Sequence, residues 1–339
     1  MKWNAYVVKR ETPFDGYDCM GTPIGELLIS TFAGRAETVE VFDSTLAGEY
    51  VACLYSDTPL VEPELLDGLV ADMEEQAVGA VAIGDGEVRR KGYQGNAIKL
   101  KDAIWASKIT DLEVLSDMTE YRRDRIVRKH LRAGVLIMGK NTVWIGDKVK
   151  IGKNVVIHPF NILKGETVIG DDAVVYGYCD LDSVEIGEHT DIRSTYALQT
   201  KIGAFSTIGP FATLRKGAVI GSHCRVGDYV EIKNSTLEDG VKAAHLAYVG
   251  DSFVGSNTNI GCGSIFANYD GKVKRSVIVG RDVFIGCNSN LVAPLEIEDG
   301  AYIAAGSTVT QNVPGNTLCI ARARQVHKGD WERPRKDRN

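Results

Sequence analysis

Aliphatic residues recur at every sixth position in the second half of this chain. The most regular series are Ile202, Ile208, Leu214, Ile220, Val226 and Ile232, then Val279, Ile285, Leu291, Ile297, Ile303 and Val309. A looser series is Ile145, Ile151, Ile157, Ile169 and Val175. A period of six fits neither an α-helix nor an alternating strand. It predicts a parallel β-helix of hexapeptide repeats, in which each repeat is one short strand and one turn and directs one aliphatic side chain to the axis.

The predicted coil begins at Val135 and runs to about Thr310, with about 18 residues in each three-sided turn. Its six-residue step is interrupted twice, in residues 232–254 and in residues 260–279. Insertions in a solenoid become loops on one face, which is often the binding face. We therefore expect a loop at each interruption, and we expect the functional residues near these loops.

Residues 1–107 have a different pattern. An apolar, β-rich run at residues 50–55 is followed by leucines at helical spacing and by a second β-rich run at residues 79–83. Strand, helix and strand in this order predict a βαβ unit in a small α/β domain. Residues 38–42 predict another strand and residues 23–32 a helix.

Residues 108–134 predict a helix that connects this domain to the coil. Its basic residues are Arg122, Arg123, Arg125, Arg128 and Lys129. Acidic residues are interleaved with them, so we interpret the basic face as a solvated amphipathic surface. The predicted organisation is an α/β domain at 1–107, the connecting helix at 108–134, the β-helix at 135–325 and a basic tail at 326–339. The tail is either solvated or contacts an anionic ligand or a neighbouring subunit.

The composition of the chain excludes several classes of function. The net charge of −6 argues against nucleic acid as the main partner. Seven scattered cysteines without a CxxC pair indicate reduced thiols and neither a disulfide framework nor a zinc site. There is no signal-peptide pattern and no apolar run of about 18 residues, so we expect a cytoplasmic protein without membrane contact.

Several polar residues near the interruptions are candidates for chemistry. Arg215 and Lys233 are 18 residues apart and would stack on one face as an anion clamp, unless they are only surface charges. His245 has the chemistry of a general base, although a single histidine is also commonly structural. Asn259 and Asn268 suit hydroxyl or amide recognition, and they also favour turns. Asp57 follows a predicted strand and is either a metal ligand or a turn residue.

Residues 208–334 resemble the acetyltransferase half of the GlmU family, the bifunctional N-acetylglucosamine-1-phosphate uridyltransferases/glucosamine-1-phosphate N-acetyltransferases. The matching segments, in order, are IGPFATLRKGA, VGDYVEIKNS, AAHLAYVGD, SNTNIGCGSIFANYDG, VGRDVFIGCNSNLVAP, IAAGSTVTQNV and IARARQ, followed by Trp331. A weaker resemblance extends back to about Lys108, so that some two thirds of the chain are covered.

The resemblance implies a left-handed β-helix that works as a homotrimer and transfers acetyl from acetyl-CoA to the amine of glucosamine 1-phosphate, for UDP-N-acetylglucosamine biosynthesis. It implies that Arg215 and Lys233 hold the sugar phosphate, that His245 is the general base and that Asn268 orients the amine or His245. Tyr248, Asn259 and Lys274 would line the sugar site. The positions at acetyl-CoA would be Cys262, Tyr269, Cys287, Ala305 and Arg322. Cys262 stands where the family usually has Ala, Cys287 where it often has Ser and Lys216 where Pro is common.

The front of the chain resembles the family less closely. Residues 54–61 are similar to the metal-binding strand end of the uridyltransferase domain, which would make Asp57 a former metal ligand. The glycine-rich phosphate loop is absent, since residues 1–20 contain only Gly16, and Thr110 stands where the family has Asn. We therefore expect a shortened domain without uridyltransferase activity, and Mg²⁺ only if that activity survives. A different amino-sugar phosphate as acceptor and a non-catalytic scaffold remain alternatives.

Overall fold

The computed structural model describes residues 3–8, 36–39, 49–55, 61, 63–100 and 104–329. These residues belong to two compact units, one within 1–168 together with 181–183, the other within 169–180 and 184–339. Asp57, the predicted helix at 23–32 and residues 330–339 of the basic tail lie outside the described residues.

The first unit contains a mixed sheet with α2 (Pro63–Glu75) as its helix. Its strands, in the order of the sheet, are β2 (Ala36–Val39), β1 (Trp3–Val8), β3 (Tyr50–Tyr55), β5 (Gly86–Arg90), β4 (Ala80–Ile83) and β6 (Ile98–Lys99). Leu54, Leu66 and Ile83 are fully buried in its core. The predicted α/β layer is confirmed, but β3 and β4 are not neighbours, because β5 turns back and pairs antiparallel with both of them.

A long helix, α3 (Leu112–Arg132), follows the short 3₁₀ turn η1 (Ile104–Ala106). Asp111 caps α3, since its Oδ1 accepts a hydrogen bond from the Val114 amide at 2.9 Å. The interpretation of its basic face as solvated is wrong for two residues. Arg122 is 5% exposed and pairs with Asp147, and Arg123 is 9% exposed with its guanidinium 5.1 Å from the Trp144 ring centroid. Among the described residues, no helix is long and apolar enough to cross a membrane.

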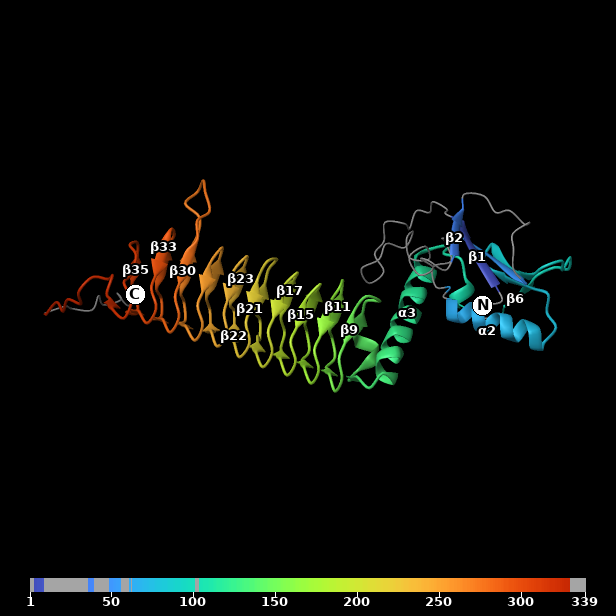
Figure 1. Ribbon diagram of the computed structural model, residues 1–339, viewed down its shortest axis with the longest axis horizontal. Coiled ribbons are helices and arrows are strands. Elements are labelled where there is room, and N and C mark those ends of the chain that lie inside the picture. The colour runs from blue at the N-terminus through green and yellow to red at the C-terminus, as the bar shows by residue number, and fades with distance from the viewer. Residues whose placement is uncertain are drawn as a thin grey trace, which may run out of the picture. The chain divides into compact units, whose positions relative to one another are not determined.

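The rest of the described chain is a coil of short parallel strands, shown in Figure 1 as successive turns. After the 3₁₀ turn η2 (Lys140–Thr142), its strands fall into three sheets, which we name faces 1, 2 and 3. Face 1 contains β7 (Leu136–Ile137), β10 (Val156–Ile157), β13 (Val174–Val175), β16 (Asp191–Ile192), β19 (Thr207–Ile208), β22 (Arg225–Asp228), β25 (Lys242–His245), β28 (Asn259–Ile260), β31 (Phe284–Ile285), β34 (Tyr302–Ile303) and β36 (Leu318–Cys319).

Face 2 contains β8 (Trp144–Ile145), β11 (Ile162–Lys164), β14 (Asp180–Asp182), β17 (Tyr196–Leu198), β20 (Thr213–Leu214), β23 (Glu231–Lys233), β26 (Tyr248–Gly250), β29 (Ile265–Ala267), β32 (Asn290–Val292) and β35 (Thr308–Val309). Face 3 contains β9 (Lys150–Ile151), β12 (Val168–Ile169), β15 (Glu185–Ile186), β18 (Lys201–Ile202), β21 (Val219–Ile220), β24 (Thr236–Leu237), β27 (Phe253–Val254), β30 (Val277–Val279) and β33 (Leu295–Ile297). Strands therefore stack face by face, as the repeat predicts.

The aliphatic ladders form the core of the coil. Ile208 lies opposite Val226 and Leu214 opposite Ile232, and all four side chains are fully buried. Each aliphatic side chain thus packs on its equivalent one turn away, which removes its apolar surface from water without a distant partner. The predicted hexapeptide β-helix is confirmed.

The first predicted loop, at 232–254, is wrong. Strands β24, β25 and β26 continue the coil there, and Leu237, Ala243 and Val249 continue its buried ladder. The step shortens to five residues at two corners, where Asn234 and Asp251 have left-handed backbone angles, with φ of 45° and 50°. The pattern failed because a shortened corner and an inserted loop both break a strict six-residue count.

The second predicted loop is real. Between β29 and β30, residues 268–276 leave the coil as an excursion, visible in Figure 1 beside β30. Tyr269 and Lys274 form an antiparallel bridge across this excursion, and the Arg275 amide donates to the Asn268 carbonyl at 2.8 Å. The coil resumes in register, since Phe253 pairs with Ile278 and Val254 with Val279.

Candidate functional site

Three cations converge at the end of face 2. Arg215 directly follows β20 and Lys233 ends β23, and these two strands are paired neighbours. Lys274 comes from the 268–276 excursion and lies beside Lys233. The contact with the Lys274 ammonium, and after it the charge of Arg215, lower the pKa of Lys233. A bound anion would relieve this mutual repulsion of the three cations.

Glu231 balances part of this charge. Its Oε1 lies 2.9 Å from Nη1 of Arg215, and the hydrogen bond raises the pKa of the Arg215 guanidinium. The ion pair of this carboxylate is with Arg215, the cation that follows the neighbouring strand β20. The sequence interpretation of Arg215 and Lys233 as stacked cations agrees with this geometry, and the structure adds Lys274 to them.

Asp251 organises the polar residues next to the cations. Its Oδ1 accepts a hydrogen bond from Nδ2 of Asn234 at 2.7 Å, and its Oδ2 accepts one from Nδ2 of Asn268. Partial burial opposes ionisation, but these hydrogen bonds and the charges of Lys274 and Lys233 lower the pKa of Asp251 overall. Asp251 was not among the predicted site residues, and a single Asp in a turn carries no distinctive sequence signal.

Gly250 provides space for two predicted site residues. A Cβ atom added there would lie 2.4 Å from the Tyr248 hydroxyl and 2.8 Å from Nδ2 of Asn268. Tyr248, at the start of β26, and Asn268, just after β29, therefore meet over the bare backbone of Gly250. The structure thus brings together Arg215, Lys233, Tyr248, Asn268 and Lys274.

His245 has a carboxylate partner that the sequence analysis missed. His245 and Asp228 are opposite each other on β25 and β22, and Nδ1 of His245 lies 2.6 Å from Oδ1 of Asp228. The hydrogen bond from His245 lowers the pKa of Asp228. A neutral imidazole that donates from Nδ1 has its lone pair on Nε2, which then accepts a proton. Asn268 donates to Asp251, and its expected role at the amine or at His245 stays a prediction.

The predicted cofactor residues continue the column of His245 along one corner of the coil. His245 ends β25, and Cys262, Cys287 and Ala305 lie at the equivalent positions just after the paired face-1 strands β28, β31 and β34, one turn apart. All four residues are exposed. Arg322 extends the column, because a Cβ on Gly306 would lie 3.7 Å from its Cδ. A long ligand lying along this corner would have one end at His245.

Two other predicted residues lie elsewhere. Asn259 begins β28 and lies opposite Lys242, on face 1, whereas Arg215 and Lys233 belong to face 2. Tyr269 donates its hydroxyl hydrogen to the Gly271 carbonyl at 2.7 Å, within the excursion. Tyr269 therefore belongs to the excursion that carries Lys274 and not to the column after the face-1 strands, and its expected role at the cofactor stays a prediction.

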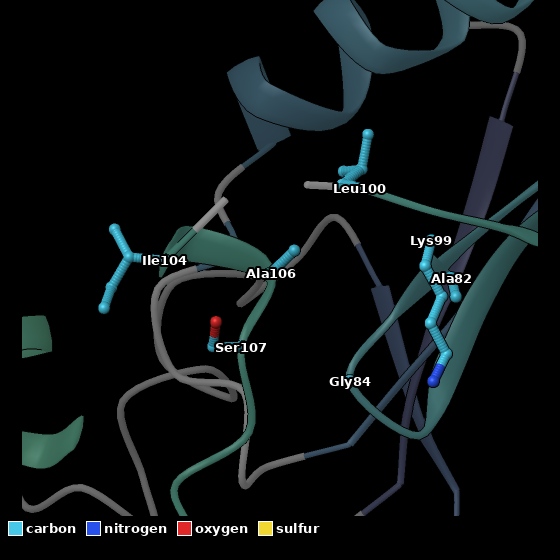
Figure 2. A pocket seen from close by; sticks show the side chains of 7 residues that line it. All are labelled: Ala82, Gly84, Lys99, Leu100, Ile104, Ala106 and Ser107. Atoms are coloured by element: carbon cyan, nitrogen blue, oxygen red, sulfur yellow. The ribbon is translucent and has the colours of Figure 1, made fainter. Parts of the chain in front are cut away.

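The first unit has a separate hollow of about 380 Å³ at the carboxyl ends of β4 and β6. Figure 2 shows Ala82, Gly84 and Lys99 on one side of it and Ile104, Ala106 and Ser107 on the other. Lys99 is the only charged residue among the described residues that line it. These residues offer no acid–base pair, and no group of three or more possible metal ligands occurs in the described part of the chain.

Comparisons with known proteins place the coil in a class. The family of bacterial transferase hexapeptide proteins (six repeats) matches residues 199–234 and 276–311. Together with the three stacked parallel faces, this match defines a left-handed parallel β-helix of the hexapeptide-repeat transferases. A solved structure, the UDP-N-acetylglucosamine acyltransferase of Francisella novicida, aligns with a TM-score of 0.34 and 17% identity over 55% of this chain and 67% of that chain.

Sequence relatives are more specific. The bifunctional protein GlmU of Staphylococcus haemolyticus is 46% identical over 220 residues, which are 65% of this chain and 49% of the relative. GlmU of Brevibacillus brevis is 45% identical over 230 residues, which are 67% of this chain and 50% of the relative. The chain belongs to the GlmU family. It spans about half the length of the curated relatives it matches.

Proposed function

We propose that the protein is an acetyl-CoA-dependent N-acetyltransferase that converts glucosamine 1-phosphate to N-acetylglucosamine 1-phosphate, for UDP-N-acetylglucosamine biosynthesis. The observation that carries this proposal is the convergence of Arg215, Lys233 and Lys274 in the coil that also carries the Asp228–His245 pair. A sugar phosphate supplies the dianion that the three cations attract. The GlmU relatives supply the reaction class.

The proposed reaction is direct acyl transfer. The amine of the bound sugar is protonated at neutral pH and becomes a nucleophile only after it loses a proton. Nε2 of His245 accepts this proton as the amine attacks the thioester carbonyl, and Asp228 holds the ring and stabilises the imidazolium. The tetrahedral intermediate then collapses and releases CoA as its thiol. Tyr248 and Asn268 orient the sugar next to the phosphate site.

Acetyl-CoA would lie along the column of Cys262, Cys287 and Ala305, with Arg322 near its phosphates. These positions support the proposal because they stack in line with His245. Asn259 and Tyr269 retain the roles that the family resemblance implies, at the sugar and at the cofactor. We further propose a homotrimer, which native mass spectrometry tests directly.

We propose that the front unit has no uridyltransferase activity. Its described hollow carries a single charged residue, Lys99, and the glycine-rich phosphate loop is missing from the sequence. Incubation with UTP, Mg²⁺ and N-acetylglucosamine 1-phosphate should release no pyrophosphate. Pyrophosphate release above that of a boiled sample would show a bifunctional enzyme, with Asp57 as a candidate Mg²⁺ ligand.

The acetyltransferase is tested with a panel of acceptors, in which product mass is measured after incubation with acetyl-CoA. The acceptors are glucosamine 1-phosphate, galactosamine 1-phosphate, free glucosamine and a UDP-linked amino sugar. We expect glucosamine 1-phosphate to give the highest kcat/KM and free glucosamine to be poor, because it lacks the phosphate. Acetylation of another member would reassign the acceptor, and no product with any member would favour a non-catalytic scaffold.

A further inference from the structure

Cys262 and Cys287 form an exposed pair of thiols on adjacent turns of the coil. They follow the paired strands β28 and β31, and the Asn288 amide donates to the Cys262 carbonyl at 2.7 Å. A Cβ on Gly261, which precedes Cys262, would lie 2.7 Å from the Cys287 nitrogen. The two cysteines are therefore direct neighbours across the stack, although they are 25 positions apart in the sequence.

The other cysteines of the described residues are less accessible. Cys53, Cys179 and Cys224 are buried, and Cys319 is partly buried. Burial raises the pKa of the Cys179 thiol to about 11 and also raises that of Cys224. Because the thiolate is the reactive form, these two buried thiols are poor nucleophiles at neutral pH. Among the described cysteines, only Cys262 and Cys287 are both exposed and adjacent.

The spacing suits a disulfide. Neighbouring parallel strands are about 4.8 Å apart, and disulfides join Cα atoms about 4.4–6.8 Å apart. Residues at equivalent positions just beyond paired strands fall within this range. Both positions lie just after the ends of their strands, and both residues are exposed to solvent.

We propose that Cys262 and Cys287 are a redox-sensitive dithiol, and that its oxidation to a disulfide hinders binding of a ligand along the corner of the coil next to His245. The oxidant is a low-molecular-weight disulfide such as glutathione disulfide. One cysteine thiolate attacks it to form a mixed disulfide and releases one thiol. The second cysteine thiolate then attacks the protein sulfur, forms the Cys262–Cys287 bond and releases the second thiol. The two cysteines lose two electrons and two protons in total, and the oxidant is reduced to two thiols.

The consequence for activity rests on the proposed function, whereas formation of the disulfide does not. The bridged sulfurs would lie on the surface along which we place acetyl-CoA, one turn beyond His245. We expect the oxidised protein to transfer acetyl at least about tenfold more slowly at a low acetyl-CoA concentration, which corresponds to about 1.4 kcal/mol of lost binding. Dithiothreitol should restore the rate.

The test oxidises the full chain with glutathione disulfide, removes the reagent and maps disulfides by mass spectrometry after non-reducing digestion. Acetylated sugar phosphate is measured directly over initial rates, because released CoA is itself a thiol and would reduce the bridge. Cys262→Ala, Cys287→Ser and Cys224→Ala are oxidised in parallel, and each is compared with its own reduced sample.

We expect a disulfide-linked Cys262–Cys287 peptide in the wild type and in Cys224→Ala, together with reversible inhibition of acetyl transfer. Cys262→Ala and Cys287→Ser should show neither the peptide nor this inhibition. Only mixed disulfides, a bridge between two chains or a bridge to another cysteine would overturn the dithiol. A complete Cys262–Cys287 bridge with unchanged acetyl transfer would overturn its effect on the column. If the reduced protein transfers no acetyl at all, the proposed function fails, and the peptide map still decides whether the dithiol exists.

Discussion

Asp228 and His245 lie opposite each other on β22 and β25, and Oδ1 of Asp228 is 2.6 Å from Nδ1 of His245. The parallel stack produces this pair, because two residues 17 positions apart in the sequence become neighbours one turn apart. The Asp228 carboxylate is ionised at neutral pH, and the hydrogen bond from His245 lowers its pKa further, so that it can orient the imidazole and balance the charge of the protonated ring.

Replacement of His245 should stop proton removal from the amine. We expect His245→Ala to lower kcat by about 10²-fold or more, in the range of a lost general base. The side chain is exposed, so the thermal unfolding midpoint should change little. Unchanged kcat in steady-state assays would contradict the assignment of His245 as the base.

Asp228→Asn keeps the size of the side chain and removes its charge. We expect kcat to fall by about tenfold, less than in a buried catalytic triad, because this pair is open to water. The KM for glucosamine 1-phosphate should stay nearly constant, since Asp228 does not contact the cation cluster. A loss confined to KM, or an equal loss in Asp191→Asn on β16, would indicate a structural role for Asp228.

Lys233→Ala should weaken binding of the sugar phosphate selectively. Hydrogen bonds to charged groups contribute about 1.5–3 kcal/mol, which predicts a rise in KM of about 10- to 100-fold. The KM for acetyl-CoA should change little. Lys201→Ala is the matched control, because Lys201 is an exposed cation on face 3 that pairs with Glu185 at 3.0 Å. Equal effects of both variants would contradict a specific phosphate site.

Gly250→Ala tests the space between Tyr248 and Asn268. The added methyl group would lie 2.4 Å from the Tyr248 hydroxyl, so one of the two side chains must move. We expect kcat/KM to fall by about tenfold or more, as misplaced contacts cost this much in oriented reactions. Gly68→Ala in α2 is the control, since a Cβ there meets nothing within 4 Å. Normal kinetics of Gly250→Ala would show that this contact is dispensable.

The lowered pKa of Asp251 predicts a pH dependence of stability. A carboxyl whose folded pKa is below its unfolded value of about 3.9 stabilises the fold above that pH, and this stabilisation is lost as pH falls through the folded pKa. Asp251→Asn should therefore lower the melting temperature at pH 7. The difference from the wild type should shrink below about pH 4. A constant difference from pH 7 to pH 3 would mean that ionisation of Asp251 is not involved.

The regular part of the fold was predictable because each turn of the coil places a buried aliphatic residue at a fixed spacing in the sequence, as with Ile208 and Val226. The irregular corners were not predictable, because a five-residue step at Asn234 looks the same in the sequence as an inserted loop. Arg215 and Lys233 were predictable from their spacing of 18 residues. The roles of Asp228 and Asp251 were not predictable, because the partners of their side chains depend on the lengths of the turns, which the six-residue repeat does not determine. Burial of Arg122 and Arg123 depends on packing against Asp147 and Trp144, which no helical periodicity encodes.

The excursion at 268–276 leaves the register of the coil unchanged on both sides, since Phe253 and Val254 pair with Ile278 and Val279 across it. We therefore expect it to behave as an exchangeable cassette, whose length and composition can vary while the coil keeps its geometry. Because the cassette carries Lys274 and begins at Asn268, we expect that exchanging this one loop would alter the acceptor preference of the proposed transferase. The Asp228–His245 pair, which is built on strands of the coil, would stay in place.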